Sequence, residues 1–299
     1  MSKNKSRMST EKDLAKLIEE IKKQEFETTD EINDFLRNLQ GQSLEDLPKR
    51  TDKKGRSEDL VFEAYEHPVS KGKKLVKQAL AIDPNNVEAY NYLAGIEKDI
   101  DGAIKMFEKA IKVGEKALGK KFFKEEKGYF WGIMQTRPFM RAKAGLADCL
   151  YAKNEVDKAI GIYEEMMELN PNDNQGIRYL LSTLLLTKSD LTKFETFIEN
   201  REDEDCAVWN YNMALYQFKK SGQSASSEEK LLKAYSSNKY VLDYMLGVKE
   251  MPKELPRYIG IGDDSEAVSY VDGSWGVWRK TAGALDWLYK FKQKRQKIN

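Results

Sequence analysis

The sequence has few of the residues on which secreted, redox or zinc proteins depend. Its 299 residues include two cysteines, one histidine and seven prolines. Cys149 and Cys206 lie in unrelated contexts and do not form a disulfide framework, which indicates a reducing compartment. With His67 as the single histidine, histidine-based catalysis and zinc binding are poor candidates. We therefore expect no metal site and no cofactor.

Long hydrophobic runs are also missing. The longest strongly apolar stretch, residues 180–187, falls far short of the ~18–20 residues that a membrane span needs. Lys3, Lys5 and Arg7 resemble the charged start of a signal peptide, but the segment that follows is polar. We expect a cytoplasmic protein with no membrane span.

Charge of one sign is in excess only locally. The chain has 50 Lys and Arg against 49 Asp and Glu, for a net charge of +1. Residues 279–299, however, contain seven basic residues and one acidic residue, so the rest of the chain is acidic. The simpler interpretation is a helix end whose cations suit the helix dipole. The alternative function is binding of nucleic acid or an anionic surface by this basic tail.

Residues of similar type recur along the sequence with a period of 34 residues. On the expected second helices, three sets of positions recur at this spacing: Ala159, Tyr163 and Met166; Lys193, Phe197 and Asn200; Ser227, Leu231 and Ala234. The first helices keep the same register: Leu146, Ala147 and Leu150; Leu180, Leu181 and Leu184; Ala214, Leu215 and Phe218. Gly222, Asn154 and Lys188 fall at the turn inside each pair, where positive φ is expected. Such a period predicts stacked pairs of amphipathic helices.

Over about residues 68–250 this pattern resembles the tetratricopeptide repeat (TPR) family, and residues 140–171 are the clearest unit, although Lys143 departs from the family pattern. Residues 136–142 and 169–180 look like a subgroup of bacterial TPR proteins related to the suppression-of-tumorigenicity seven family. The resemblance implies an all-α fold, a right-handed superhelical solenoid with a concave face. It also implies a non-enzymatic scaffold for protein binding. The resemblance supplies no catalytic chemistry that could be assigned to residues of this chain.

The regions outside the repeats suggest three domains. Residues 1–60 are expected to form a helical extension and linker, residues 61–250 the repeats, and residues 251–299 a capping extension with the basic tail. Leu14, Leu17, Ile18 and Ile21 share one face of the first expected helix. Near the other end, three tryptophans are available to cover the last repeat or to mediate self-association: Trp275, Trp278 and Trp287.

The family's concave surface is lined by first-helix positions, and counting in this register yields a candidate peptide-binding groove. Its residues are Arg141, Asp148, Tyr151, Gln175, Arg178, Trp209, Asn212 and Tyr216, together with Arg137 just upstream. Arginine offers a planar fork to carboxylates, and Trp and Tyr offer amphipathic contact area. We therefore expect a protein or peptide partner with an acidic or carboxylate group.

The aromatic segment 128–141 has two compatible interpretations. Phe130 and Trp131 fill a wedge beside a shortened repeat, or Arg137 and Arg141 face the groove and bind an acidic group. No catalytic constellation is recognisable. Cys149 lies among apolar neighbours, as a core thiol does, and the acidic neighbours of Cys206 would raise its pKa.

Overall fold

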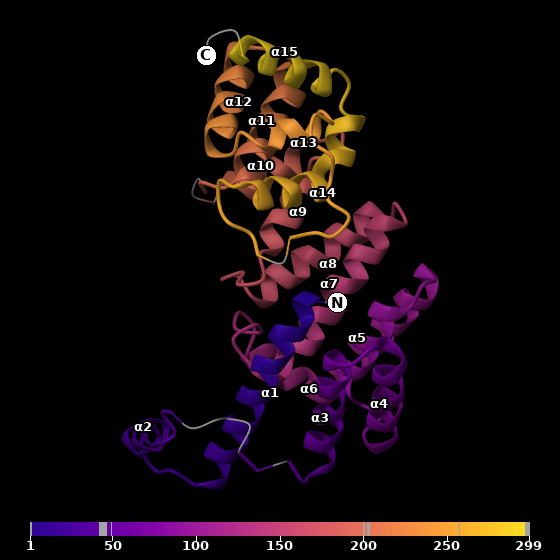
Figure 1. Ribbon diagram of the computed structural model, residues 1–299, viewed down its shortest axis with the longest axis vertical. Helices are drawn as coiled ribbons and strands as arrows, with labels where there is room; N and C mark the ends of the chain where they lie inside the picture. Colours follow the sequence, from indigo (N-terminus) through magenta and orange to yellow (C-terminus); the bar gives the residue numbers. More distant parts are fainter. Residues whose placement is uncertain are drawn as a thin grey trace. The chain divides into compact units, whose positions relative to one another are not determined.

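The computed structural model describes residues 2–41, 47–48, 50–199, 201, 204–256 and 258–296, with side chains from residue 8 onward. These residues form fifteen α-helices and a short 3-10 helix, and no strand occurs among them (Figure 1). The all-α prediction is therefore confirmed. None of the described helices is long and apolar enough to cross a membrane. The chain divides into two compact units, Met1–Asn174 and Gln175–Asn299.

Unit 1 is built from an N-terminal helix, a short projecting helix and three helix pairs. Its helices are α1 (Ser2–Lys23), α2 (Thr29–Asn38), α3 (Lys53–Glu66), α4 (Val69–Ile82), α5 (Val87–Ile96), α6 (Ile100–Glu125), the 3-10 helix η2 (Met134–Thr136), α7 (Arg137–Ala152) and α8 (Val156–Leu169). The pairs are α3 with α4, α5 with α6, and α7 with α8, and the first helices of neighbouring pairs pack on one another. Unit 1 thus has a face made by α3, α5 and α7.

Small residues let these helices approach closely. Ala147 and Ala159 are fully buried, and Tyr163 and Met166 are each 1% exposed in the layer between α7 and α8. These are the positions that the 34-residue register assigns to the core. Asn154 adopts the expected positive φ of 62° in the turn between the two helices. The repeat pattern therefore describes this pair correctly.

Unit 2 contains the remaining helices. They are α9 (Ile177–Leu185), α10 (Thr192–Glu199), α11 (Ala207–Ser221), α12 (Ala225–Ser237), α13 (Val241–Met245), α14 (Asp264–Lys280) and α15 (Ala284–Gln296). α11 pairs with α12, and Gly222 ends α11 with a φ of 61°, as expected. α14 packs against α9, α11 and α13, so it covers the face made by the first helices of this unit.

The register fails around α9 and α10. Leu180 is 41% exposed rather than in the core, while Leu181 and Leu184 are buried. In α10 the buried aromatic is Phe194, whose ring lies 5.0 Å from that of Tyr216; Phe197 is only half-buried. Asn200 lies outside the described residues. Because α10 is short and begins at Thr192, Phe194 rather than Phe197 packs against Tyr216 of α11.

The aromatic segment before α7 is a packed wedge, as the first interpretation predicts. Phe130 is fully buried, and its ring lies 5.0 Å from that of Phe123 and 6.1 Å from that of Phe139. Trp131 remains half-buried at the edge. Thr136 is the N-cap residue of α7, but its hydroxyl donates to the carbonyl oxygen of Ile133 and does not cap the helix.

The C-terminal helices α14 and α15 follow a segment that contains prolines and glycines. Two of their three tryptophans are buried. Trp278 and Trp287 are fully or nearly fully buried with stacked rings, whereas Trp275 is 39% exposed. The expectation that Trp278 and Trp287 could mediate self-association is therefore wrong for this structure, because neither is on the surface. The expected domain boundaries after residues 60 and 250 stay predictions; the compact units divide after Asn174.

Candidate interaction site

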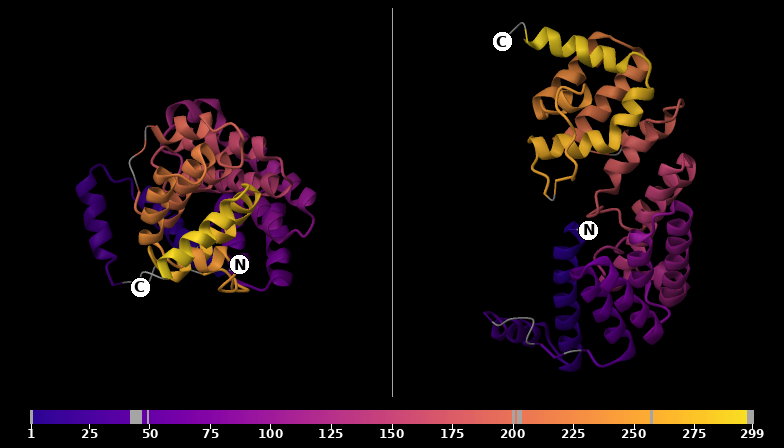
Figure 2. Two further views of the ribbon diagram at one scale, coloured as in Figure 1. Left: turned by 90° about the horizontal axis from the view of Figure 1, so that it is seen from above. Right: turned by 45° about the vertical axis from the view of Figure 1, so that its right-hand side comes forward.

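Helix α1 lies on the face of unit 1 that the first helices α3, α5 and α7 make (Figures 1 and 2). It packs against α3, and its residue Glu11 is 4% exposed. The Oε1 atom of Glu11 accepts a hydrogen bond of 2.9 Å from Nη1 of Arg141 on α7. The N-terminal extension therefore occupies the surface that was expected to form an open groove in this unit.

Arg141 is the centre of this site. Its Nε donates to Oε2 of Glu88 on α5 at 2.9 Å, and its Nη2 lies 2.8 Å from the same oxygen. The Arg141 side chain is 13% exposed. Burial acts to lower the pKa of Arg141, but the charges of Glu88 and Glu11 outweigh it and raise this pKa. The guanidinium thus bridges two buried carboxylates from two other helices.

Glu88 is held from three sides. Its Oε1 accepts 2.7 Å from the hydroxyl of Tyr65 on α3, and its Oε2 accepts 3.0 Å from Nδ2 of Asn91 as well as the bond from Arg141. Asn91 Nδ2 also donates to the Pro138 carbonyl at the start of α7, at 2.8 Å. Because α3, α5 and α7 all contribute, the position of Arg141 is fixed by the packing of three helices.

Arg137 lies one helical turn before Arg141. Its Nε donates to the carbonyl oxygen of Trp131 at 3.0 Å, and its guanidinium carbon lies 5.5 Å from the centre of the Trp131 ring. One Nη of Arg137 lies 3.8 Å from Glu11. The structure therefore brings Arg137 and Arg141 together, on a rigid aromatic base, around one carboxylate.

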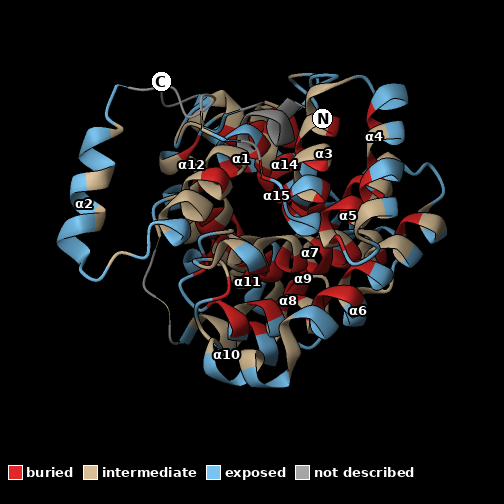
Figure 3. Ribbon diagram, turned by 90° about the horizontal axis from the view of Figure 1, so that it is seen from below, coloured by how far each residue is buried: buried red, intermediate tan, exposed pale blue. Residues whose placement is uncertain are grey.

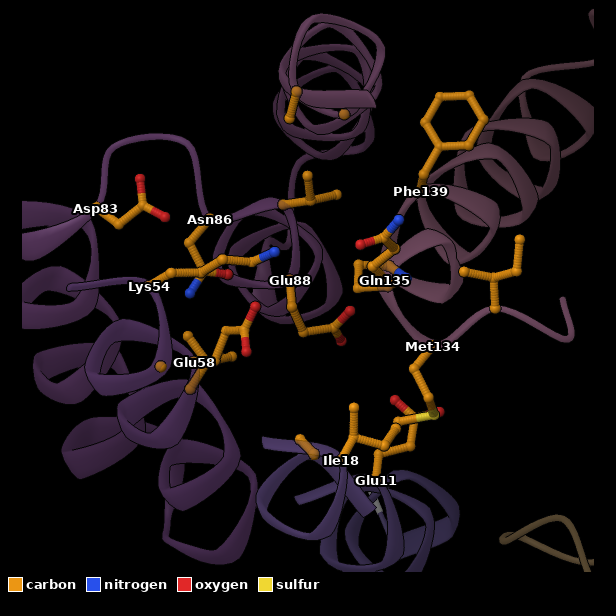
Figure 4. Close-up of a pocket in the computed structure, with 18 of the residues that line it drawn as sticks. Glu11, Ile18, Lys54, Glu58, Asp83, Asn86, Glu88, Met134, Gln135 and Phe139 are labelled. Atoms are coloured by element: carbon orange, nitrogen blue, oxygen red, sulfur yellow. The ribbon is translucent and has the colours of Figure 1, made fainter. Parts of the chain in front are cut away.

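A cavity of about 890 Å³ adjoins this cluster between α1 and the helices behind it (Figure 4). Glu11 and Ile18 border it from α1, Glu58 from α3, and Met134 with Gln135 from the segment before α7. One part of its wall is apolar and another carries Asp83, Asn86 and Lys54. The cavity has room for side chains that α1 does not supply.

Two other expected groove residues of unit 1 lie apart from Arg141. Asp148 is exposed and accepts a hydrogen bond from the hydroxyl of Tyr163. Tyr151 is half-buried, and burial raises the pKa of its hydroxyl. Both belong to the later turns of α7, and neither borders the cavity beside Arg141.

In unit 2 the expected groove residue Arg178 is paired within the unit, whereas Gln175 has an unpaired buried oxygen. Arg178 donates from Nε to Oε1 of Glu204 at 2.7 Å and from Nη2 to Oε2 at 3.1 Å, and it stacks 4.2 Å from the ring centre of Tyr179. Gln175 is half-buried, and its Oε1 is a buried atom without a hydrogen-bond partner.

Trp209, Asn212 and Tyr216 require a correction, because an open groove would expose them and the structure buries them. They are 2%, 1% and 8% exposed. Asn212 donates to the hydroxyls of Ser182 and Thr183, and its Oδ1 accepts 3.1 Å from the Tyr270 hydroxyl of α14. Tyr216 donates to Glu195 at 2.6 Å. Asn212 is covered by Tyr270 of α14, whereas Tyr216 packs against Phe194 and Glu195 of α10.

Sequence reasoning missed Glu11 and Glu88. A signal for Glu11 was present, because it shares a helical face with Leu14 and Ile18, where an acidic residue interrupts an apolar stripe. Glu88 gave no such signal, since it lies in the first turn of α5, where an acidic residue suits the helix dipole anyway.

No protein-family model matches the chain, and no curated protein matches it. Among the described residues, no three His, Cys, Asp or Glu side chains gather as metal ligands would. Cys149 and Cys206 are both free thiols, and burial is the main cause that raises the pKa of each.

Proposed function

We propose that the protein is a non-enzymatic interaction scaffold, and that the face of unit 1 around Arg137 and Arg141 binds an acidic segment of another protein. The observation that carries this proposal is that α1 already occupies that face and places a carboxylate on Arg141. Arg141 holds a carboxylate from a helix far away in the sequence, since Glu11 and Arg141 are 130 positions apart. A guanidinium anchored by three helices is the kind of rigid group that recognises carboxylates.

The helix pairs of this chain support the finer proposal of a TPR-like right-handed superhelix. The 34-residue period, the buried alanines and the positive φ at Asn154 and Gly222 all agree with it. A cytoplasmic location and the absence of enzymatic activity remain predictions from composition.

The basic tail gives no reason to add a second function. Lys290, Lys292 and Lys294 each pair with a carboxylate within unit 2: Asp286, Asp243 and Glu228. Arg295 lies over the ring of Phe291. Three lysines of the tail are thus paired within unit 2, and Lys297 lies outside the described residues.

A photo-crosslinking experiment tests the proposal. A benzophenone amino acid replaces Gln135, an exposed residue at the mouth of the cavity, and the full chain is irradiated in cell extract. We expect discrete protein adducts that an added Arg141→Met substitution removes and an added Arg178→Ala substitution leaves unchanged. The same amino acid at Ser236, an exposed residue of α12, is the control. Adducts that survive Arg141→Met would refute the assignment of this face.

A further inference from the structure

The fit of α1 to unit 1 is incomplete. Between residues 8 and 23, the buried residues are Met8, Glu11 and Lys16, two of which are charged. The apolar stripe of Leu14, Leu17, Ile18 and Ile21 is only half-buried. A helix that belonged to the core would bury this stripe and expose its charges. The apolar side chains of α1 are thus only partly covered by the rest of unit 1.

Charge balance, in contrast, depends on α1. Two guanidiniums, those of Arg137 and Arg141, face this surface, and Glu88 is the one carboxylate that α5 supplies to them. Glu11 is the second carboxylate, at 2.9 Å from Arg141 and 3.8 Å from Arg137. Whatever occupies this face has to bring an acidic group, because a buried guanidinium without a full set of partners is costly.

The helix that follows α1, α2, does not pack into the body of unit 1. α2 contains no buried residue, and Figure 3 shows it projecting from the body of unit 1. The cap of α3 is local, since the Asp52 carboxylate accepts from the Gly55 amide at 3.0 Å. Release of α1 therefore leaves the cap of α3 in place, and besides the contact at Glu11 it breaks the ion pairs of Lys12 with Glu66 at 3.7 Å and of Glu19 with Arg50 at 4.0 Å.

We propose that the partner of unit 1 is an amphipathic helix with a carboxylate at the position of Glu11, and that it binds by displacing α1. α1 acts as a built-in competitor that keeps Arg141 neutralised until a helix with larger apolar side chains fills the cavity of about 890 Å³. This inference rests on the proposed function and adds to it the chemistry of the partner and a way to regulate access.

The probe is a fluorescent synthetic peptide of residues 2–23, added in trans to the full chain and followed by fluorescence anisotropy. In the wild type, α1 competes from a tethered position at an effective concentration of about millimolar, so the peptide binds weakly. Glu11→Ala in the chain weakens this competitor, and we expect the apparent Kd of the peptide to fall about tenfold or more. Glu20→Ala is the matched control, because Glu20 accepts a hydrogen bond of 2.8 Å from Lys23 on the same helix.

Two further variants test the recognised group. A peptide with Glu11→Lys is expected to bind the Glu11→Ala chain at least tenfold more weakly than the unmodified peptide. Arg141→Met in the Glu11→Ala chain is expected to weaken the unmodified peptide by a similar factor. Circular dichroism of each chain verifies that unit 1 remains helical, and Arg141→Lys serves as a second variant if Arg141→Met loses helix.

The possible outcomes separate the ideas. Equal peptide affinity in the wild-type, Glu11→Ala and Glu20→Ala chains would overturn the displacement of α1, and crosslinked adducts at Gln135 would still support the proposed function. Light scattering tests whether the occupant is instead α1 of a second copy. If the wild-type chain is a dimer and the peptide dissociates it, the proposal of a different partner protein is overturned. Tighter binding by Glu11→Ala alone, by a monomeric chain, supports the inference.

Discussion

The two units of this protein each have one of their own helices over the face of their first helices, but the two coverings differ in kind. α14 in unit 2 buries eight residues, most of them apolar or aromatic. α1 in unit 1 is held at Glu11 by charge and buries Met8 as its one apolar residue between positions 8 and 23. The difference teaches that α14 is part of a hydrophobic core, whereas α1 is attached mainly by polar contacts and buries little apolar surface.

Polar contacts in α14 reinforce its core role. The carboxylate of Glu266 accepts 2.8 Å from the Ala207 amide at the start of α11 and 2.9 Å from Asn238. The indole of Trp278 donates 2.7 Å to the Tyr270 hydroxyl, which itself donates to Asn212. Every one of these groups is buried, so α14 cannot leave without exposing unsatisfied polar atoms.

The largest expected effect would come from an attack on α14. Trp278→Ala removes a fully buried ring that stacks on Trp287, and we expect a loss of about 3–5 kcal/mol in the unfolding free energy of unit 2. Urea denaturation followed by tryptophan fluorescence measures it, because Trp209, Trp275 and Trp287 remain as reporters in unit 2. Trp275→Ala, at a 39% exposed residue, should cost less than half as much; equal losses would contradict a core role for α14.

Removing the guanidinium of unit 1 should have the next largest effect. Arg141→Met leaves Glu88 and Glu11 buried beside each other, and we expect a loss of about 3 kcal/mol in the stability of unit 1. Circular dichroism during thermal unfolding measures this loss. Arg37→Met, whose side chain is 72% exposed in a pair with Asp34, is the control and should change stability little. If Arg141→Met combined with Glu11→Gln is no more stable than Arg141→Met alone, repulsion by Glu11 is not the cause.

Hydrogen exchange compares the two coverings directly. We expect amides of α1 to exchange at least about 100-fold faster than amides of α14, because α1 opens locally whereas α14 exchanges only when unit 2 unfolds. Mass spectrometry of peptides from residues 2–23 and 264–280 makes the measurement. If the amides of both helices exchange at the same rate, then α1 is packed as firmly as α14, and the contrast between the two coverings is wrong.

The same contrast between α1 and α14 explains which parts of this arrangement the sequence predicts and which it does not. Periodicity reports which residues are apolar on each helix, so it identified the α7–α8 core at Ala147, Ala159 and Tyr163. It also placed Arg141 and Asn212 on the first-helix faces. It could not report what covers those faces, because coverage depends on long-range packing of α1 and α14 outside the repeat. Asn212 therefore looked like a groove residue, and the role of Glu11 depended on a contact 130 residues away.

The smallest expected effect concerns the arginine of the predicted groove that lies in unit 2, Arg178, whose contact is nearer the surface. Burial acts to raise the pKa of Glu204, but hydrogen bonds from Arg178 and Tyr179 outweigh it and lower this pKa. The resulting stability is present above the ordinary glutamate pKa of about 4.3 and is lost as pH falls through the lower value of the folded state. Since the pair is about a quarter exposed, Glu204→Gln should remove about 0.5–1 kcal/mol at pH 7 and nothing at pH 2. Urea denaturation of unit 2 at both pH values, with the exposed Glu199→Gln as control, tests this sign. A loss that grows toward low pH would mean that Arg178 does not stabilise the charged form of Glu204, and the contrast with the buried Arg141 cluster would then need another cause.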